Sequence, residues 1–207
     1  MNLRLAVAGG SSARRAVIMN RTSVDHPYTT VRRELRFSVG FGDLTRALES
    51  LLGRLDVDVI AEIAAKLPRE RLRERLAAVI GPSGFALFQK IDHGAMLRSL
   101  TGRDVQAITY VVGNALLAIE MTSYEPTVGL YVPPRLYVCE REPGATLVTY
   151  DVPSATLAQF DVPRVSAIAS TLDARVEKLV DVAAALALKR RARSASRVVT
   201  DEAGHRR

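Results

Sequence analysis

The stretch that decides the fold lies at residues 85–154. It reads FALFQKIDHGAML at 85–97, DVQAITYVVGN at 104–114 and EPTVGLYVPPRLYVCEREPGATLVTYDVPS at 125–154. These apolar runs are rich in β-branched and aromatic residues and end in polar or turn-forming residues, which is typical of strands. Pro143-Gly144 separates two of the runs, and a Pro-Gly pair in that position indicates a hairpin. The stretch therefore predicts several antiparallel strands that follow one another closely.

The segments on either side add another strand and several helices. Residues 29–39 alternate in part between apolar and charged side chains, which predicts a first strand. Asp43 can cap a helix that continues to about residue 52, two short helices are predicted at 57–66 and 69–80, and a long helix begins at Pro163. The long helix has an inward apolar stripe made of Val165, Ile168, Ala169, Leu172, Val176, Leu179, Val180 and Ala183. This order of elements, β-α-β-β-β-β-α with a helical insertion, is an α+β fold.

Four short elements carry a resemblance to a known family. They are Ile91-Asp92-His93, Gly113-Asn114, Gly129-Leu130-Tyr131-Val132-Pro133 and Tyr150-Asp151-Val152-Pro153-Ser154. Together they resemble the family known as domain of unknown function 302, over roughly residues 29–184. That family is similar in fold to the TATA-binding-protein class, so the resemblance implies a curved antiparallel sheet backed by helices. It also implies a homodimer.

The chain departs from the family pattern in two places. Ala115 follows the Gly-Asn element where Pro is usual. The helical insertion at about 57–80 adds about two dozen residues between the first helix and the Ile-Asp-His strand. We expect the insertion to pack on one end of the sheet or to take part in a subunit contact.

Length and charge divide the chain into three parts. Its 207 residues, of which 48% are hydrophobic, suffice for one domain, and we place that domain at 29–188. The extension at 1–28 carries a charge of +3, the tail at 189–207 carries +5, and the domain carries −1. We expect the extension to be poorly ordered and the basic tail to be disordered. The near-neutral domain argues against nucleic-acid binding by the core, although the tail could bind a polyanion.

Cysteine content and hydropathy bear on compartment. Cys139 is the single cysteine, which excludes an intramolecular disulfide and gives no secretory signature. We interpret it as a structural residue, because nothing basic except Arg141 lies beside it. No window approaches the roughly 18 apolar residues that a membrane span needs. We therefore predict a cytoplasmic protein without a membrane partner.

Five residues form the predicted ligand-binding set: His93, Tyr110, Asn114, Met121 and Tyr131. Tyrosine and methionine side chains with a few polar tips suit a small apolar ligand. The same side chains also suit a core or a dimer contact. Asn114 could hold a polar ligand or close a turn. These alternatives remain open from the sequence.

His93 is the one candidate for acid/base catalysis. It follows Asp92 at a strand end, and Gly94 after it would let the backbone turn sharply. Asp92 or Asn114 could orient its ring, or the ring could simply hydrogen-bond a loop carbonyl. The sequence has no HExxH or CxxC motif and no Ser, Cys or second His at a recognisable spacing. It therefore predicts no metal site and no cofactor.

These observations favour a dimeric domain that binds a small molecule or acts as an interaction module. An enzyme with His93 as acid/base is the alternative, and nucleic-acid binding through the basic tails is the third hypothesis.

Overall fold

The computed structural model describes residues 22–55, 61, 66 and 68–204, with side chains as far as Arg193. The elements in chain order are β1 (Arg32–Phe37), α1 (Phe41–Leu51), β2 (Gly53–Arg54), α3 (Arg69–Ala78), β3 (Ala86–Asp92), α4 (His93–Thr101), β4 (Ala107–Gly113), α5 (Ala115–Tyr124), η1 (Pro126–Leu130), β5 (Arg135–Glu142), β6 (Ala145–Asp151), α6 (Pro153–Leu157), η2 (Ala158–Phe160) and α7 (Pro163–Gly204).

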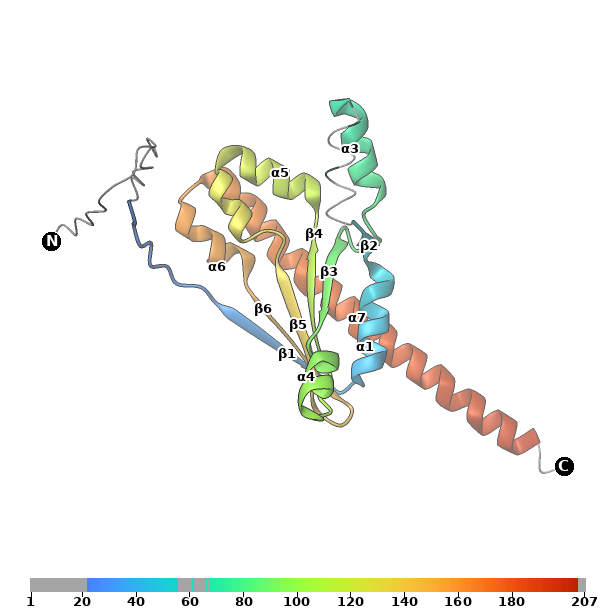
Figure 1. Ribbon diagram of the computed structural model, residues 1–207. Helices are drawn as coiled ribbons and strands as arrows, with labels where there is room; N and C mark the ends of the chain where they lie inside the picture. The colour runs from blue at the N-terminus through green and yellow to red at the C-terminus, as the bar shows by residue number, and fades with distance from the viewer. Residues whose placement is uncertain (1–21, 56–60, 62–65, 67, 205–207) are drawn as a thin grey trace, which may run out of the picture.

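The strands form one sheet in the order β1-β6-β5-β4-β3-β2 (Figure 1). Neighbouring strands are antiparallel except for the short pair of β2 and β3, which is parallel. Each of the five predicted strands is present, and Gly144 adopts a positive φ of 79° in the predicted Pro-Gly hairpin. The α+β prediction is confirmed. The sequence did not predict β2, α4 or α6.

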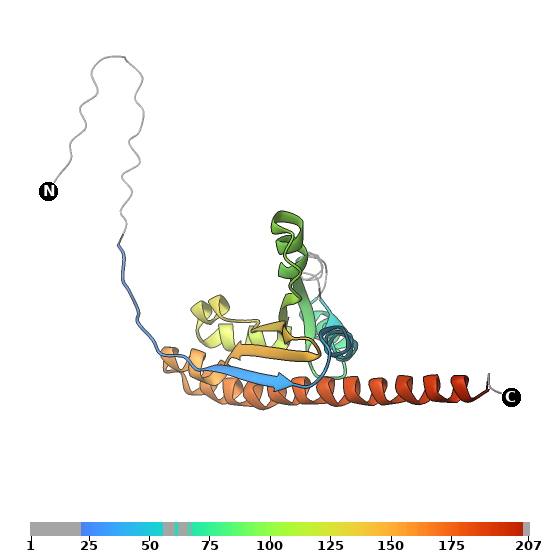
Figure 2. The same ribbon diagram turned by 90° about the horizontal axis from the view of Figure 1, so that it is seen from below.

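The sheet has one covered and one uncovered face. Helix α7 passes behind the sheet in Figure 1 and lies along one side of it in Figure 2. The covered face packs on α1 and α7 and holds most of the main core. Its strand residues include Leu35, Tyr110, Val112, Leu136, Val138 and Val148. The opposite face, here called the uncovered face because neither α1 nor α7 packs on it, carries the exposed residues Arg32, Glu34 and Arg36 of β1. It also holds a small buried cluster of Ala107, Cys139 and Leu147.

A β-bulge in β3 changes which side chains share a face. A regular strand would place Phe85, Leu87, Ile91 and His93 together, as the sequence predicts. Instead, Leu87 pairs with Val112 while Gln89 pairs with Val111, so Phe88 is an extra residue. An extra residue reverses the alternation of side chains beyond it. Phe85 and Leu87 therefore pack in the core, whereas Ile91 and His93 lie on the uncovered face.

Helix α7 is longer than the sequence predicts. Its predicted inward stripe is confirmed, since each residue from Val165 to Ala183 in that stripe is buried. The helix then continues to Gly204, so the expectation of a disordered tail from residue 189 differs from the structure. Ala, Arg, Lys and Leu are strong helix formers, and no Gly or Pro interrupts this part before Gly204. Figure 2 shows the last part of α7 extending beyond the sheet.

The described part of the helical insertion, from residue 68 onward, packs on one end of the sheet. The predicted helix at 69–80 is α3, whose Leu76 is buried in a small cluster with Leu55, Ala86 and Ala115. The predicted helix at 57–66 lies almost entirely outside the described residues. Helix α3 thus lies at the end of the sheet from which α5 emerges.

Candidate functional site

A hollow of about 510 Å³ lies on the uncovered face. Strands β3 to β6 and β1 all contribute to its lining, which includes His93, Thr109, Arg135, Tyr137, Thr149 and Asp151. The registers of neighbouring strands place Thr109 beside Tyr137 and Tyr137 beside Thr149. Because neighbouring strands are about 4.8 Å apart, these three side chains form a polar row across the sheet. The volume falls within the usual range for small-molecule sites.

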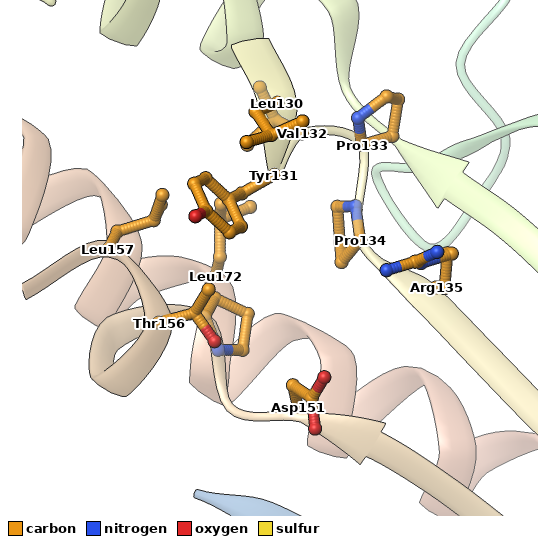
Figure 3. Close-up of a pocket in the computed structure, with 11 residues that line it drawn as sticks. Leu130, Tyr131, Val132, Pro133, Pro134, Arg135, Asp151, Thr156, Leu157 and Leu172 are labelled. Carbon is orange, nitrogen blue, oxygen red and sulfur yellow. The ribbon is translucent and has the colours of Figure 1, made fainter. Parts of the chain in front are cut away.

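A smaller cavity of about 70 Å³ opens at the end of the sheet where β5 begins and β6 ends. Its wall combines apolar residues with the polar side chains of Thr156, Arg135 and Asp151, and the apolar part includes Tyr131, Pro133, Pro134, Leu157 and Leu172. In Figure 3, Arg135 and Asp151 lie across an open space from Tyr131 and Leu157. Arg135 and Asp151 also line the hollow, so the cavity and the hollow adjoin one another.

Close packing between the end of β4 and the segment before β5 shapes the cavity. A Cβ atom at Gly113 would lie 2.7 Å from Cβ of Pro133, so only glycine leaves room for the proline there. The Pro134 carbonyl also accepts a hydrogen bond from Val112 N at 3.1 Å. The Gly-Asn element and the Gly-Leu-Tyr element are therefore held against each other at the end of β4.

Tyr131 is fixed as one wall of the cavity by aromatic contacts. Its ring meets those of Tyr28 and Phe160 edge to face, with centroid distances of 5.6 Å and 5.8 Å. Its hydroxyl donates to Oε1 of Gln159 at 3.4 Å. Such aromatic pairs contribute packing with a defined ring orientation.

All four elements that carry the family resemblance border this one region. The Ile-Asp-His element brings His93 to the hollow, and the Tyr-Asp-x-Pro-Ser element brings Asp151 to its rim and Pro153 to the cavity. The Gly-Leu-Tyr-x-Pro element forms part of the cavity wall, and Gly113 packs against its Pro133. Segments that are far apart in the sequence therefore meet around one continuous surface.

Charge in the region is uneven. Arg32 Nε lies 3.7 Å from Asp151 Oδ1, which is an ion pair at the rim. Arg135 is exposed and forms no ion pair with any side chain that the structure describes. Burial raises the pKa of Tyr137, so its hydroxyl remains a hydrogen-bond donor at neutral pH. The rim thus has one arginine more than its acidic groups neutralise.

The structure separates the five predicted ligand-binding residues. His93 lines the hollow and Tyr131 lines the cavity, so these two border the same region. Tyr110 and Met121 are buried in the main core. Met121 and Asn114 also line a cavity of about 10 Å³ that shares Pro133 and Pro134 with the wall of the cavity beside Tyr131. Asn114 caps α5 by accepting hydrogen bonds from Leu116 N and Leu117 N, while its amide donates to Gly84 O at 3.1 Å.

His93 lacks the orienting partners that the sequence suggests. Its Nε2 lies 2.9 Å from Oγ1 of Thr109. Asp92 instead caps α4, because its Oδ1 accepts from Ala95 N at 2.8 Å, and Asn114 is at the other end of β4. Gly94 is required for space rather than for a turn, since a Cβ there would lie 2.1 Å from the Val105 carbonyl oxygen.

The sequence did not predict five of the lining residues as part of a site, namely Thr109, Arg135, Tyr137, Thr149 and Asp151. The available signal was the alternation within strands: Arg135 and Tyr137 alternate with the apolar Leu136 and Val138. That pattern predicts polar side chains on the face opposite the core. Their convergence depends on strand order, which the pattern does not contain.

The described part of the chain offers neither a metal site nor a membrane-spanning helix. It contains no group of three or more His, Cys, Asp or Glu side chains placed to hold a metal ion. None of its helices combines the length and apolar character that a membrane crossing requires.

The comparison with known proteins agrees with the resemblance. The family described as "Domain of unknown function DUF302" matches residues 61–183, and the chain belongs to that family. The crystal structure of an uncharacterized conserved DUF302 protein from Bacillus stearothermophilus is similar in fold, with a TM-score of 0.51 and 18% sequence identity. The similarity covers 73% of this chain and 97% of the Bacillus chain. No curated protein matches this chain.

Proposed function

We propose that this protein is a small-molecule-binding domain whose ligand lies on the uncovered face of the sheet. The observation that carries the proposal is the adjoining hollow and cavity, which together offer an apolar end and a polar row. Binding sites commonly combine an apolar lining with a few convergent polar groups. In this proposal the ligand lies over His93 and Tyr131. The other three predicted residues, Tyr110, Asn114 and Met121, are then structural.

Binding fits the geometry better than acid/base catalysis does. A general base needs a group that orients it and fixes its proton. His93 has the hydroxyl of Thr109 as its hydrogen-bond partner, and the side chains of Asp92 and Asn114 are engaged as helix caps. We therefore assign His93 to ligand contact, and an enzymatic role stays the alternative.

Nucleic-acid binding has one supporting feature. Lys189, Arg190, Arg191 and Arg193 are all exposed on the part of α7 that extends beyond the sheet. A run of cations on a helix is more often a solvated surface than a binding site. Binding that falls steeply with salt would be needed to favour this third hypothesis.

A ligand-observed NMR screen against a fragment library tests the proposal. The library contains anionic, neutral and cationic compounds, and each hit is repeated with the variant Thr109→Phe, which places a ring in the middle of the hollow. Thr101→Phe, at the exposed end of α4, is the matched control. We expect hits that Thr109→Phe abolishes and Thr101→Phe retains.

Two results would contradict the proposal. One is a screen without hits, and the other is a set of hits that Thr109→Phe leaves unchanged. Native mass spectrometry of the freshly purified protein complements the screen, because extra mass that is lost on denaturation identifies a retained ligand. The same spectrum tests the homodimer, which we keep as a proposal.

A further inference from the structure

We propose that the ligand is a small organic monocarboxylic acid, with its carboxylate on Arg135 and its apolar end in the cavity beside Tyr131. This inference rests on the proposed function and names the ligand class for the same site.

The first argument compares Arg135 with the three arginines of β1. Arg36 lies 3.4 Å from Glu34, Arg33 lies 3.4 Å from Glu177, and Arg32 lies 3.7 Å from Asp151. Arg135 has no such partner among the described side chains, although it stands at the junction of the hollow and the cavity. A guanidinium group presents paired N–H donors that match a carboxylate in two parallel hydrogen bonds.

The second argument is a set of hydroxyl groups beside that arginine. Thr149 Oγ1 is buried and has no hydrogen-bond partner in the described structure. It lies next to Tyr137 in the polar row, and Tyr137 lies two residues beyond Arg135 on β5. A buried hydroxyl without a partner is unusual in native proteins. Thr149 lines the hollow and is only half-buried as a residue, so a rotation about its χ1 angle would turn the hydroxyl toward a ligand oxygen there.

The third argument limits the charge of the ligand. Arg32, Arg135 and Asp151 together give the rim an excess of one positive charge. A single negative charge balances this excess, whereas a phosphate dianion would leave the rim with a net negative charge. Beyond Arg135 and Asp151, the residues that line the cavity are uncharged, with Thr156 and Tyr131 as its polar members, so it offers no further charge to a second charged end. These features favour a monoacid with a compact apolar body.

Isothermal titration calorimetry with matched acids and amides tests the inference. The probes are benzoate and butyrate, their neutral amides benzamide and butyramide, and inorganic phosphate. We expect at least one acid to bind at least about tenfold more tightly than its amide, because the charge-assisted hydrogen bonds to Arg135 are lost with the amide. Phosphate is expected to bind more weakly than the acid.

Substitutions assign the effect to Arg135. Arg135→Gln should weaken binding of the acid about tenfold or more and leave binding of the amide unchanged. Arg135→Lys should fall between the two, since it keeps the charge and loses the paired donors. The control is Arg36→Gln, on the same face but paired with Glu34 and outside the hollow. Circular dichroism establishes that each variant is folded.

The outcomes separate this inference from the proposed function. Equal affinity for acid and amide, unchanged acid binding in Arg135→Gln, or preference for phosphate would each overturn the inference. So would a site that Thr109→Phe blocks but that binds only neutral or cationic fragments, although the proposed function would then stand. If no probe and no fragment binds, both fail.

Discussion

Two threonines of strand β6 show how differently the two faces of the sheet are used. Thr146, on the covered face, is buried, and its Oγ1 donates to the Val39 carbonyl at 2.6 Å. Thr149, on the uncovered face, has a buried Oγ1 with no hydrogen-bond partner in the described structure. Leaving a buried polar group unpaired costs about 1–3 kcal/mol. Of the two threonines, Thr146 is therefore satisfied within the fold, whereas Thr149 is not. The Tyr150 hydroxyl, in the main core, is likewise buried without a hydrogen-bond partner among the described residues, so the contrast concerns these two threonines.

If stability resides on the covered face, a cavity there should have the largest effect. Leu136 is fully buried in the main core on β5, and Leu136→Ala should lower the free energy of unfolding by about 2–5 kcal/mol. Gln89→Ala, at an exposed position on the uncovered face, should change it by less than about 0.5 kcal/mol. Urea denaturation measures both. Similar losses for the two variants would remove the energetic distinction between the faces.

The contact between Gly113 and Pro133, at the end of the sheet, should have the next largest effect on stability. In Gly113→Ala the new Cβ would lie 2.7 Å from Cβ of Pro133, and overpacking of this kind costs about 1–3 kcal/mol. Because Pro133 lines the cavity, ligand binding should weaken as well. In the matched variant Gly129→Ala the nearest atom is Cγ2 of Thr122 at 3.8 Å, which is an ordinary contact. Thermal unfolding compares the two, and equal melting temperatures would show that Pro133 moves freely.

The sequence predicts the covered face better than the uncovered one. The apolar stripe of α7 and the five main strands follow from local periodicity, which the core enforces. The bulge at Phe88 has no such signal, and it places His93 on the uncovered face. The site also depends on the pairing of Tyr137 with Thr149, which are distant in sequence. Periodicity predicts which face of the sheet a residue lies on, but not which residues lie next to it on the neighbouring strands. The proximity of Arg135 and Thr149 could therefore not be predicted from the sequence.

The stability of the protein should depend on pH through Glu49 of α1. Its Oε1 accepts from the Tyr110 hydroxyl at 2.7 Å and from Lys90 Nζ at 2.6 Å. Burial raises the pKa of Glu49, but hydrogen bonds from Lys90 and Tyr110 outweigh it, so the pKa is below its ordinary value of 4.5. Burial and the Glu49 carboxylate both raise the pKa of Tyr110, which keeps its hydroxyl protonated.

The direction of the pH effect follows from the lowered pKa. The stabilisation from Glu49 is present above pH 4.5 and is lost as the pH falls through the lower pKa of the folded state. Glu49→Gln should lower stability by about 1 kcal/mol at pH 7, where it replaces a charged acceptor with a neutral one. Its difference from the wild type should shrink in acid. Urea denaturation of both proteins, repeated at steps of about half a pH unit between about pH 3 and 7, tests this. A difference that stays constant over the range would show that the carboxylate is not responsible.

The smallest effect on stability should come from removing the hydroxyl of Thr149, which has no hydrogen-bond partner among the described residues. Thr149→Val replaces Oγ1 with a methyl group of similar shape, so stability should stay the same or rise by up to about 1 kcal/mol. Thr146→Val on the same strand should lose about 1–3 kcal/mol, because it leaves the Val39 carbonyl without its donor. Binding of the acid should weaken in Thr149→Val if the carboxylate uses that hydroxyl. A clear loss of stability in Thr149→Val would mean that the hydroxyl has a partner within the folded protein, and the contrast between the two faces would not hold at this strand.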